Sequence, residues 1–379
     1  MRWTLYVDMD AYYVSCELRE RSELVGGPVI VGPDPRLGPT RGVVLSASYE
    51  ARAFGIHSAM PVAQAVRLCP AAVWIPADHS KYAAVAREVL GHLEGRVLRV
   101  VSLSIDEAAC EIEAADAVAA ERAARELQES IRSDLHLPAS IGVAAHRVVA
   151  KIASDRAKPG GVVVVPPDQT QAFLAPLPVR AVPGVGPKTA ERLRGAGVER
   201  IGDLLTVSPR SVRRAVGGFA AELVALARGS PADLRSDDAG PRSRSAAETF
   251  LEDEEDVDRI AAALDRLAAG LSGSLAEERL WFRTVTVGVR WADFSHTQRS
   301  RTLASPTGDP AILRASAQRI LVDWRAKESA GPRRKIRTLS LSVGRLSTAP
   351  AAQQRLDAFD GGSDRTVKNG APLSDRASS

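Results

Sequence analysis

The chain has few cysteines, no long apolar run and no leader-like start, and each absence excludes a class of protein. No apolar run approaches the ~18 residues that a membrane-spanning helix requires, and the first residues lead directly into a strand-like run instead of a signal peptide. The three cysteines lack CxxC spacing, which argues against a disulfide framework or a zinc site. We therefore expect a cytoplasmic protein without membrane contact, in which Cys16, Cys69 and Cys110 are small buried hydrophobic residues.

The composition is that of an ordinary globular protein, with 45% hydrophobic and 25% charged residues. A length of 379 residues favours two or more domains and is sufficient for a sizeable core. The formal charge of +4 is a mild basic excess, so the distribution of the charges is more informative than their sum. The sequence shows no solenoid-type repeat.

Two acidic clusters each follow a strand-like run. Asp8 and Asp10 follow the apolar residues 5–7, and Asp106 and Glu107 follow residues 97–104. An Asp-x-Asp pair alone is a weak signal, because most such pairs are solvated turns or caps. Carboxylates pressed into apolar strands are costly unless a cation compensates them. Carboxylates on adjoining strands can hold two divalent metals for in-line phosphoryl chemistry, so we expect a metal site here.

A glycine-rich segment at residues 182–190 precedes a helical stretch that carries several arginines. It matches neither the P-loop pattern nor G-x-G-x-x-G. It does resemble a helix–hairpin–helix, in which Gly184 and Gly186 would let backbone amides approach a DNA phosphate, with Lys188 nearby. The alternative is a plain turn between two helices.

Basic residues are concentrated in the last folded segment. Several of them occupy alternating strand positions, so we expect them to share one face of a sheet that lies on phosphate backbones. The candidates for DNA contact are Arg299, Arg301, Arg334 and Arg337. The alternative is a solvated basic face without a ligand.

Four stretches, in order, carry a resemblance to a known family: DMDAYYVSCE, SYEARAFGI, SIDEA and AKIASDRAKPGG. Together they resemble the polymerase core of Y-family translesion DNA polymerases, in the DinB or DNA polymerase IV class. The resemblance covers roughly residues 1–346. It implies template-directed DNA synthesis with low-fidelity lesion bypass, by phosphoryl transfer from a dNTP to a primer 3′-hydroxyl.

The resemblance also implies the metal ligands. Asp8 and Asp106 would bridge two Mg²⁺ ions, Glu107 would complete the site, and the Met9 carbonyl would be a further ligand. Mn²⁺ could replace Mg²⁺. One ion would lower the pKa of the primer hydroxyl and the other would neutralise the triphosphate. We interpret Asp10 as a structural residue beside the metals.

The nucleotide-binding residues follow in the same way. Tyr13 lies at the steric-gate position, where its ring would leave no room for a ribose 2′-hydroxyl, whereas its neighbour Tyr12 is expected in the core. The residues expected to bind the nucleotide with Tyr13 are Ser46, Tyr49, Arg52 and Lys158. Tyr49 and Arg52 are three apart, which puts them on one face of a helix. We assign Lys151 and Arg147 to structure or to contact with the DNA backbone.

The implied fold is a multidomain α+β right hand with palm, small fingers, a helix–hairpin–helix thumb and a C-terminal little finger. The palm comprises residues 1–11 and 78–165, the fingers 12–77, the thumb 166–232, a linker 233–242, the little finger 243–346 and a disordered tail 347–379. Within the tail, Gln354, Leu356 and Phe359 resemble a peptide that binds the sliding clamp. The expected partners are primer–template DNA, dNTP and that clamp, with the polymerase itself a monomer.

Two rival functions remain open at this point. A non-catalytic relative that kept the fold would have lost metal carboxylates, and a two-metal nuclease would need no sugar gate. The chain departs from the family pattern at Ala109, Cys16, Val14 and Arg147. None of these is a metal carboxylate, so the departures bear on fidelity and lesion range.

Overall fold

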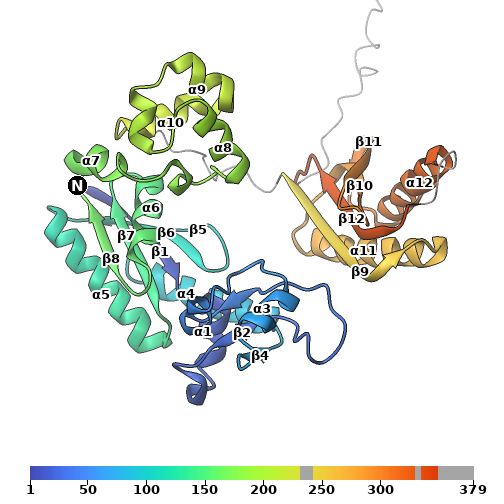
Figure 1. Cartoon of the computed structure of the whole chain (residues 1–379), viewed down its shortest axis with the longest axis horizontal. Helices are drawn as coiled ribbons and strands as arrows, with labels where there is room; N and C mark the ends of the chain where they lie inside the picture. Colours follow the sequence, from blue (N-terminus) through green and yellow to red (C-terminus); the bar gives the residue numbers. More distant parts are fainter. Residues whose placement is uncertain (231–241, 329–333, 349–379) are drawn as a thin grey trace, which may run out of the picture. The chain divides into compact units, whose positions relative to one another are not determined.

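The computed structural model describes residues 1–230, 242–328 and 334–348. The chain divides into two compact units, Met1–Asp238 and Ala239–Ser379 (Figure 1). The expected linker lies outside the described residues except for Arg242, and the expected tail lies outside them beyond residue 348. Within the described residues, no helix combines the length and the apolar character needed to cross a membrane.

A five-stranded sheet forms the centre of the first unit, in the order β5-β6-β1-β7-β8. Its strands are β1 (Arg2–Met9), β5 (Arg99–Ser102), β6 (Glu107–Glu113), β7 (Ala139–Ala144) and β8 (Val162–Val165). β1 is central and antiparallel to both β6 and β7, while β7 and β8 are parallel. The chain therefore places its first strand in the middle of the sheet, where the apolar residues before Asp8 are buried.

Helices cover the sheet, and the alternation of side chains along β1 decides what each helix touches. Leu5, Val7 and Met9 share a core with α4 (His79–Glu94) and α5 (Ala117–Leu135). Tyr6 belongs to a different core with α6 (Arg147–Ala157). Because side chains two residues apart lie on the same face, Asp8 is on the α6 side with Tyr6.

Residues 12–77 form a small subdomain around a three-stranded sheet of order β3-β2-β4. Its elements are α1 (Tyr12–Leu18), β2 (Val29–Val31), β3 (Ser46–Ala47), α2 (Tyr49–Ala53), α3 (Val62–Leu68) and β4 (Val73–Ile75). It has a hydrophobic cluster of its own, which includes Ile30, Ile56 and Met60. This is the segment in which the sequence predicts small fingers.

A helical segment follows β8, with α7 (Thr170–Leu174), α8 (Pro187–Gly195), α9 (Pro209–Val216) and α10 (Phe219–Ala227). Leu193 of α8 and Leu223 of α10 lie in one hydrophobic cluster with Ile152 of α6. The segment expected to be the thumb is thus joined to the central sheet through α6.

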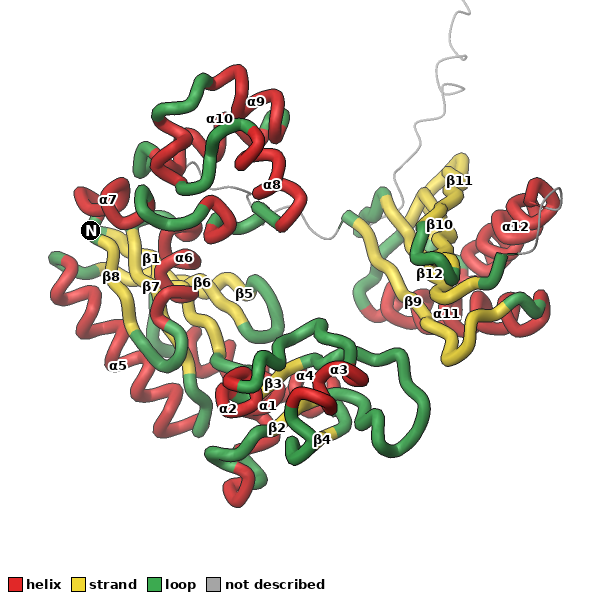
Figure 2. The backbone as a smooth tube through the Cα atoms, viewed as in Figure 1, coloured by secondary structure: helices red, strands yellow, loops and turns green. Residues whose placement is uncertain are grey.

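The second unit has the predicted sequence of strand, helix, strand, strand, helix and strand. Its elements are β9 (Ser243–Glu254), α11 (Val257–Glu277), β10 (Phe282–Trp291), β11 (His296–Thr307), α12 (Pro310–Glu328) and β12 (Ile336–Gly344). The antiparallel sheet has the order β11-β10-β12-β9, which makes β11 an edge strand (Figure 2). Val285, Val287 and Val289 of β10 pack into the core with both helices.

Candidate active site

Two of the predicted metal carboxylates face each other across neighbouring strands. The pairing of β1 with β6 puts Asp8 directly opposite Glu107. Asp8 is almost completely buried, whereas the Glu107 side chain is about one quarter exposed at 25%. The Met9 amide donates to the Asp106 carbonyl at 2.9 Å, so the backbones of the two predicted clusters touch.

Two lysines, one within α6 and one directly after it, compensate this acidic pair. Lys151 Nζ lies 2.9 Å from Asp8 Oδ2 and 2.7 Å from Glu107 Oε1. Lys158, which directly follows α6, brings its Nζ to 2.8 Å from the same Asp8 oxygen. Burial on its own would raise the pKa of Asp8, but Lys151 and Lys158 outweigh burial and hold that pKa below its ordinary value.

Close packing of α6 onto β7 places these lysines. A Cβ at Gly142 would lie 2.0 Å from the Ala150 carbonyl oxygen and 2.3 Å from the Ser154 amide nitrogen. Only glycine at this position lets the helix backbone come so near to the strand. Lys151 also lies over the Tyr6 ring, at 5.1 Å from its centroid. Burial, followed by the charge of Glu107, raises the pKa of Tyr6.

The third predicted carboxylate, Asp106, has a different partner. Asp106 accepts a hydrogen bond from the Ser104 hydroxyl at 2.6 Å. Over the described ranges, no group of three or more His, Cys, Asp or Glu side chains is arranged to hold a metal ion. In the described residues, Lys151 thus provides a cation for Asp8 and Glu107, and Ser104 provides a donor for Asp106.

Asp10 holds four parts of the chain together at the end of β1. Its carboxylate accepts from the Gly160 amide at 2.8 Å, the Ser140 hydroxyl at 2.9 Å and the Tyr49 hydroxyl at 3.0 Å. Asp10 is almost completely buried. These contacts support its interpretation as a structural residue.

Tyr13 lies beside this site at the start of α1, after Ala11, which has a positive φ of 44°. Its ring stacks on Tyr82 of α4, with centroids 4.4 Å apart. Burial, followed by the charge of Asp106, raises the pKa of Tyr13. Tyr12 is buried and donates its hydroxyl to the Tyr82 carbonyl at 2.7 Å, in agreement with the expected core role.

The predicted phosphate-binding residues lie on β3 and α2. Tyr49 and Arg52 share one face of α2, and the Arg52 guanidinium lies 4.6 Å from the Tyr49 ring centroid. Arg52 also donates to the Ala47 carbonyl at 3.1 Å. Ser46 is buried on β3. Tyr49 is bonded to Asp10 and Lys158 to Asp8, which links these residues to the acidic strand end.

The glycine-rich hairpin of the first unit has the backbone geometry that the sequence predicts. Gly184 has φ of +88°, and Gly186 is the N-cap of α8 with Pro187 in the first helical turn. A Cβ at Gly186 would meet no atom within 4 Å, so the space on that side of the helix start is open. Lys188 follows in the first turn of α8.

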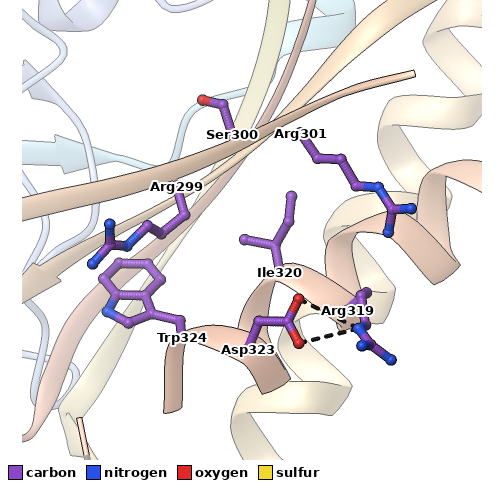
Figure 3. Close-up of a pocket in the computed structure, with 7 residues that line it drawn as sticks. All are labelled: Arg299, Ser300, Arg301, Arg319, Ile320, Asp323 and Trp324. Carbon is purple, nitrogen blue, oxygen red and sulfur yellow. Dashed lines mark hydrogen bonds and ion pairs between the residues drawn. The ribbon is translucent and has the colours of Figure 1, made fainter. Parts of the chain in front are cut away.

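Two of the predicted DNA-contact arginines, Arg299 and Arg301, share one face of the second sheet, as their alternating spacing predicts. Arg299 pairs with Val287 and Arg301 with Val285, so both arginines lie on the helix-covered side of the sheet. They border a cavity of about 540 Å³ beside Ile320 and Trp324 of α12, where Asp323 is paired with Arg319 (Figure 3). The opposite face carries cross-strand hydroxyl pairs instead: Thr284 with Thr302, Thr286 with Ser300 and Thr249 with Thr338.

The remaining predicted DNA contacts are near the end of β10. Arg334 lies over the Trp291 ring at 4.5 Å and is paired with Asp293 at 2.8 Å. Arg337 lies over the Phe294 ring at 4.6 Å. The predicted clamp-binding residues Gln354, Leu356 and Phe359 lie outside the described part of the chain.

Three family models match successive parts of the chain. The impB/mucB/samB family matches residues 7–155, the IMS family HHH motif 167–198 and the impB/mucB/samB family C-terminal domain 241–357. DNA polymerase IV of Methanoculleus marisnigri is 38% identical over 359 residues, covering 94% of this chain and 98% of the relative. DNA polymerase IV 2 of Methanosarcina mazei is 37% identical over 361 residues, covering 94% and 96%.

The chain belongs to the DNA polymerase IV class of Y-family DNA polymerases. Solved structures share the fold. A Y-family DNA polymerase chimera matches with a TM-score of 0.81 and 23% identity, covering 92% of this chain and all of that one. An insertion ternary complex of Dbh DNA polymerase matches with a TM-score of 0.64 and 22% identity, covering 90% and 98%. Y-family enzymes are DNA-directed DNA polymerases of translesion synthesis, and this is the class of enzyme described here.

Y-family polymerases generally use divalent metal ions, and the donor set of this polymerase fits such an ion. Its side-chain donors are carboxylate oxygens, which hard divalent cations prefer. The Lys151 ammonium already stands between two of them as a monovalent cation. The backbone of the third predicted ligand, Asp106, is joined to the end of β1 by the hydrogen bond from the Met9 amide.

Sequence reasoning missed three residues of the polymerase site. The sequence assigns Lys151 to structure or to the DNA backbone, whereas the structure puts it in contact with Asp8 and Glu107, two of the predicted metal ligands. The sequence gives no role to Asp155 or Tyr82. Lys151 and Asp155 are four residues apart on α6. This spacing favours an ion pair on a helix, so the sequence could have indicated the contact. Tyr82 has no such signal, because it meets Tyr13 only through the packing of α1 against α4.

Proposed function

We propose that this polymerase transfers a nucleotidyl group from a dNTP to a primer 3′-hydroxyl at a two-metal site on β1 and β6. The observation that carries the proposal is the pairing of Asp8 with Glu107 around the shared Lys151 ammonium, at the strand ends. The buried position of Asp8 supports it, since a buried carboxylate requires a compensating cation.

Asp8 and Glu107 would hold the metal with Asp106, whose side chain would exchange Ser104 for the metal, and the Met9 carbonyl is a further candidate ligand. When bound, two Mg²⁺ ions would activate the primer hydroxyl and neutralise the charge of the triphosphate, and Mn²⁺ could replace them. The lowered pKa of Asp8 supports its role, because this carboxylate is ionised at neutral pH and needs no proton loss before it binds a cation.

Arg52 and Tyr49 of α2 would bind the triphosphate, since a guanidinium can bind phosphate oxygens in a bidentate manner. Lys158 would add a point charge when it leaves Asp8. Tyr13 would contact the sugar, and its stacking on Tyr82 supports a fixed position for the ring.

DNA would be held at two places. The amides at the start of α8, after the N-cap Gly186, would donate to a backbone phosphate without reading the base sequence. The second unit would contribute Arg299, Arg301, Arg334 and Arg337. Binding to a sliding clamp, the monomeric state and the cytoplasmic location stay predictions from the sequence.

Primer extension tests the proposal. We expect the full chain with Mg²⁺ and four dNTPs to lengthen a labelled primer on a template, and to extend across a defined lesion. Asp106→Ala should abolish extension, whereas Asp168→Ala, an exposed carboxylate on a short turn, should leave it unchanged. A shortened primer would indicate the nuclease alternative, and an unchanged primer the non-catalytic alternative.

A further inference from the structure

Three carboxylates from three different elements bind the ammonium group of Lys151. The Nζ atom lies 2.9 Å from Asp8 Oδ2 on β1, 2.7 Å from Glu107 Oε1 on β6 and 2.8 Å from Asp155 Oδ1 on α6. An ammonium group has three donors, so these contacts use all of them. Lys151 therefore has no donor left for a nucleotide or for DNA while it is held in this arrangement.

The Lys151 ammonium lies between Asp8 and Glu107, where a metal ion shared by these two carboxylates would bind. A divalent ion bound by Asp8 and Glu107 would compete with the ammonium for the same oxygens. The two cations would also repel each other strongly in a partly buried site, where the Lys151 side chain is only 19% exposed. Metal and Lys151 thus exclude each other at these two carboxylates.

Asp155 offers Lys151 a second position. It lies four residues after Lys151 on the same helix, and its side chain is 44% exposed. Because this pair is formed within α6, it does not depend on the two strands. Lys151 can leave Asp8 and Glu107 and still keep one carboxylate partner at the surface.

We propose that Lys151 is a built-in placeholder cation, which holds Asp8 and Glu107 together in the metal-free polymerase and moves to Asp155 when metal binds. Lys151 is then a positioning residue that sets the metal affinity, and Asp155 is its acceptor. The inference rests on the proposed function, since it takes Asp8 and Glu107 as metal ligands.

The two partners have opposite expected effects on metal binding. Lys151→Met removes the competitor, so Mn²⁺ should bind about fivefold or more tightly. Asp155→Asn removes the alternative position, so Lys151 stays on the strand carboxylates and Mn²⁺ should bind more weakly. In the Lys151→Met background, Asp155→Asn should have a smaller effect than in the wild type, because only the longer pair of Asp155 with Lys158, at 3.6 Å, remains.

Titration of the full-length protein with Mn²⁺, followed by electron paramagnetic resonance of the unbound ion, measures these affinities without any reaction. Arg125→Gln is the matched control, because it removes one positive charge from an exposed i, i+4 pair with Glu121 on α5. This control should bind Mn²⁺ like the wild type. Unchanged or weaker binding by Lys151→Met, or tighter binding by Asp155→Asn, would overturn the proposal.

Thermal unfolding in EDTA provides a second readout. Lys151→Met should lower Tm in EDTA more than Arg125→Gln does, and Mg²⁺ should raise Tm more for Lys151→Met than for the wild type. A lysine whose only role is in folding would, when replaced, lower Tm equally with and without Mg²⁺.

If Lys151→Met does not fold, Lys151→Gln and Asp155→Asn carry the same test. Failure of wild-type primer extension would refute the proposed function, whereas an active wild type with an unaltered Lys151→Met affinity would refute this inference alone.

Discussion

Tyr13 lies on Tyr82 with the two ring centroids 4.4 Å apart and the ring planes 15° from parallel. Tyr82 is completely buried, and its hydroxyl donates to Glu17 Oε1 at 2.7 Å. Glu17 of α1 is also paired with Lys81 of α4 at 2.7 Å. The contacts between α1 and α4 therefore hold the Tyr82 ring in place. The ring of Tyr13, the proposed sugar gate, therefore packs on a second ring, Tyr82, whose position is itself fixed.

Tyr13→Ala should admit ribonucleotides, because it removes the ring that would exclude a 2′-hydroxyl. We expect the preference for dNTP over rNTP, measured as the ratio of kcat/KM values, to fall by about tenfold or more. Tyr13→Phe keeps the ring and is the matched control, with an expected preference close to that of the wild type. An unchanged ratio in Tyr13→Ala would remove the gate role.

Gly142→Ala should push α6 away from β7. The added Cβ would meet three backbone atoms of α6, which cannot move independently of the helix. We expect a loss of about 1–3 kcal/mol in the free energy of unfolding, with a lower extension rate because Lys151 and Lys158 shift with α6.

The control for this change is Gly91→Ala. A Cβ at Gly91, inside α4, would meet nothing within 4 Å. Alanine there should stabilise the helix by ~0.5–1 kcal/mol. Urea unfolding of both variants checks the pair, and shifts of the same sign would contradict the packing described for α6.

The cysteine thiols should be unreactive in the folded protein at pH 8. Cys16, Cys69 and Cys110 are all buried, as the sequence predicts. Burial raises the pKa of Cys16 to about 11 and that of Cys110 to about 12, so both thiols are protonated at pH 8. We expect little reaction with a thiol-specific disulfide reagent in buffer and reaction of all three thiols in urea.

The raised pKa values of Cys16 and Cys110 also predict how the stability of the protein changes with pH. Because the folded pKa values of the two thiols lie above the ordinary value of 9.0, their contribution is complete below about pH 9. It is lost as the pH rises through the folded values. Tm should therefore fall between pH 9 and pH 12, and a Tm that rises over this interval would contradict the assignment.

Arg299 and Arg301 are proposed to contact phosphate from the edge of the second sheet. Neither has a carboxylate partner among the described residues. The double change to glutamine should therefore reduce the slope of log Kd against log salt for primer–template DNA by about 2. Arg314→Gln is the control, since Arg314 is already paired with Asp265 at 2.5 Å and should not alter the slope. Equal slopes for all variants would remove both arginines from the DNA interface.

The amino-acid sequence by itself determined the order of elements and the family. The apolar run before Asp8 predicted a buried strand, and β1 is the central strand of its sheet. The second unit follows the predicted order of strands and helices. These features depend on local periodicity and on motifs, which involve residues that are close together in the sequence.

Only the tertiary structure decided which side chains meet. Lys151 reaches Asp8 and Glu107 because Gly142 allows α6 to lie against β7, and this contact joins residues far apart in the sequence. Arg299 and Arg301 lie on the helix side because of the pairing of β11 with β10. The exposed strand β11 has no apolar alternation that would reveal its inward face. The sequence of one strand shows that its side chains alternate between two faces. The partner strand and the packed helix determine which of the two faces points to the core.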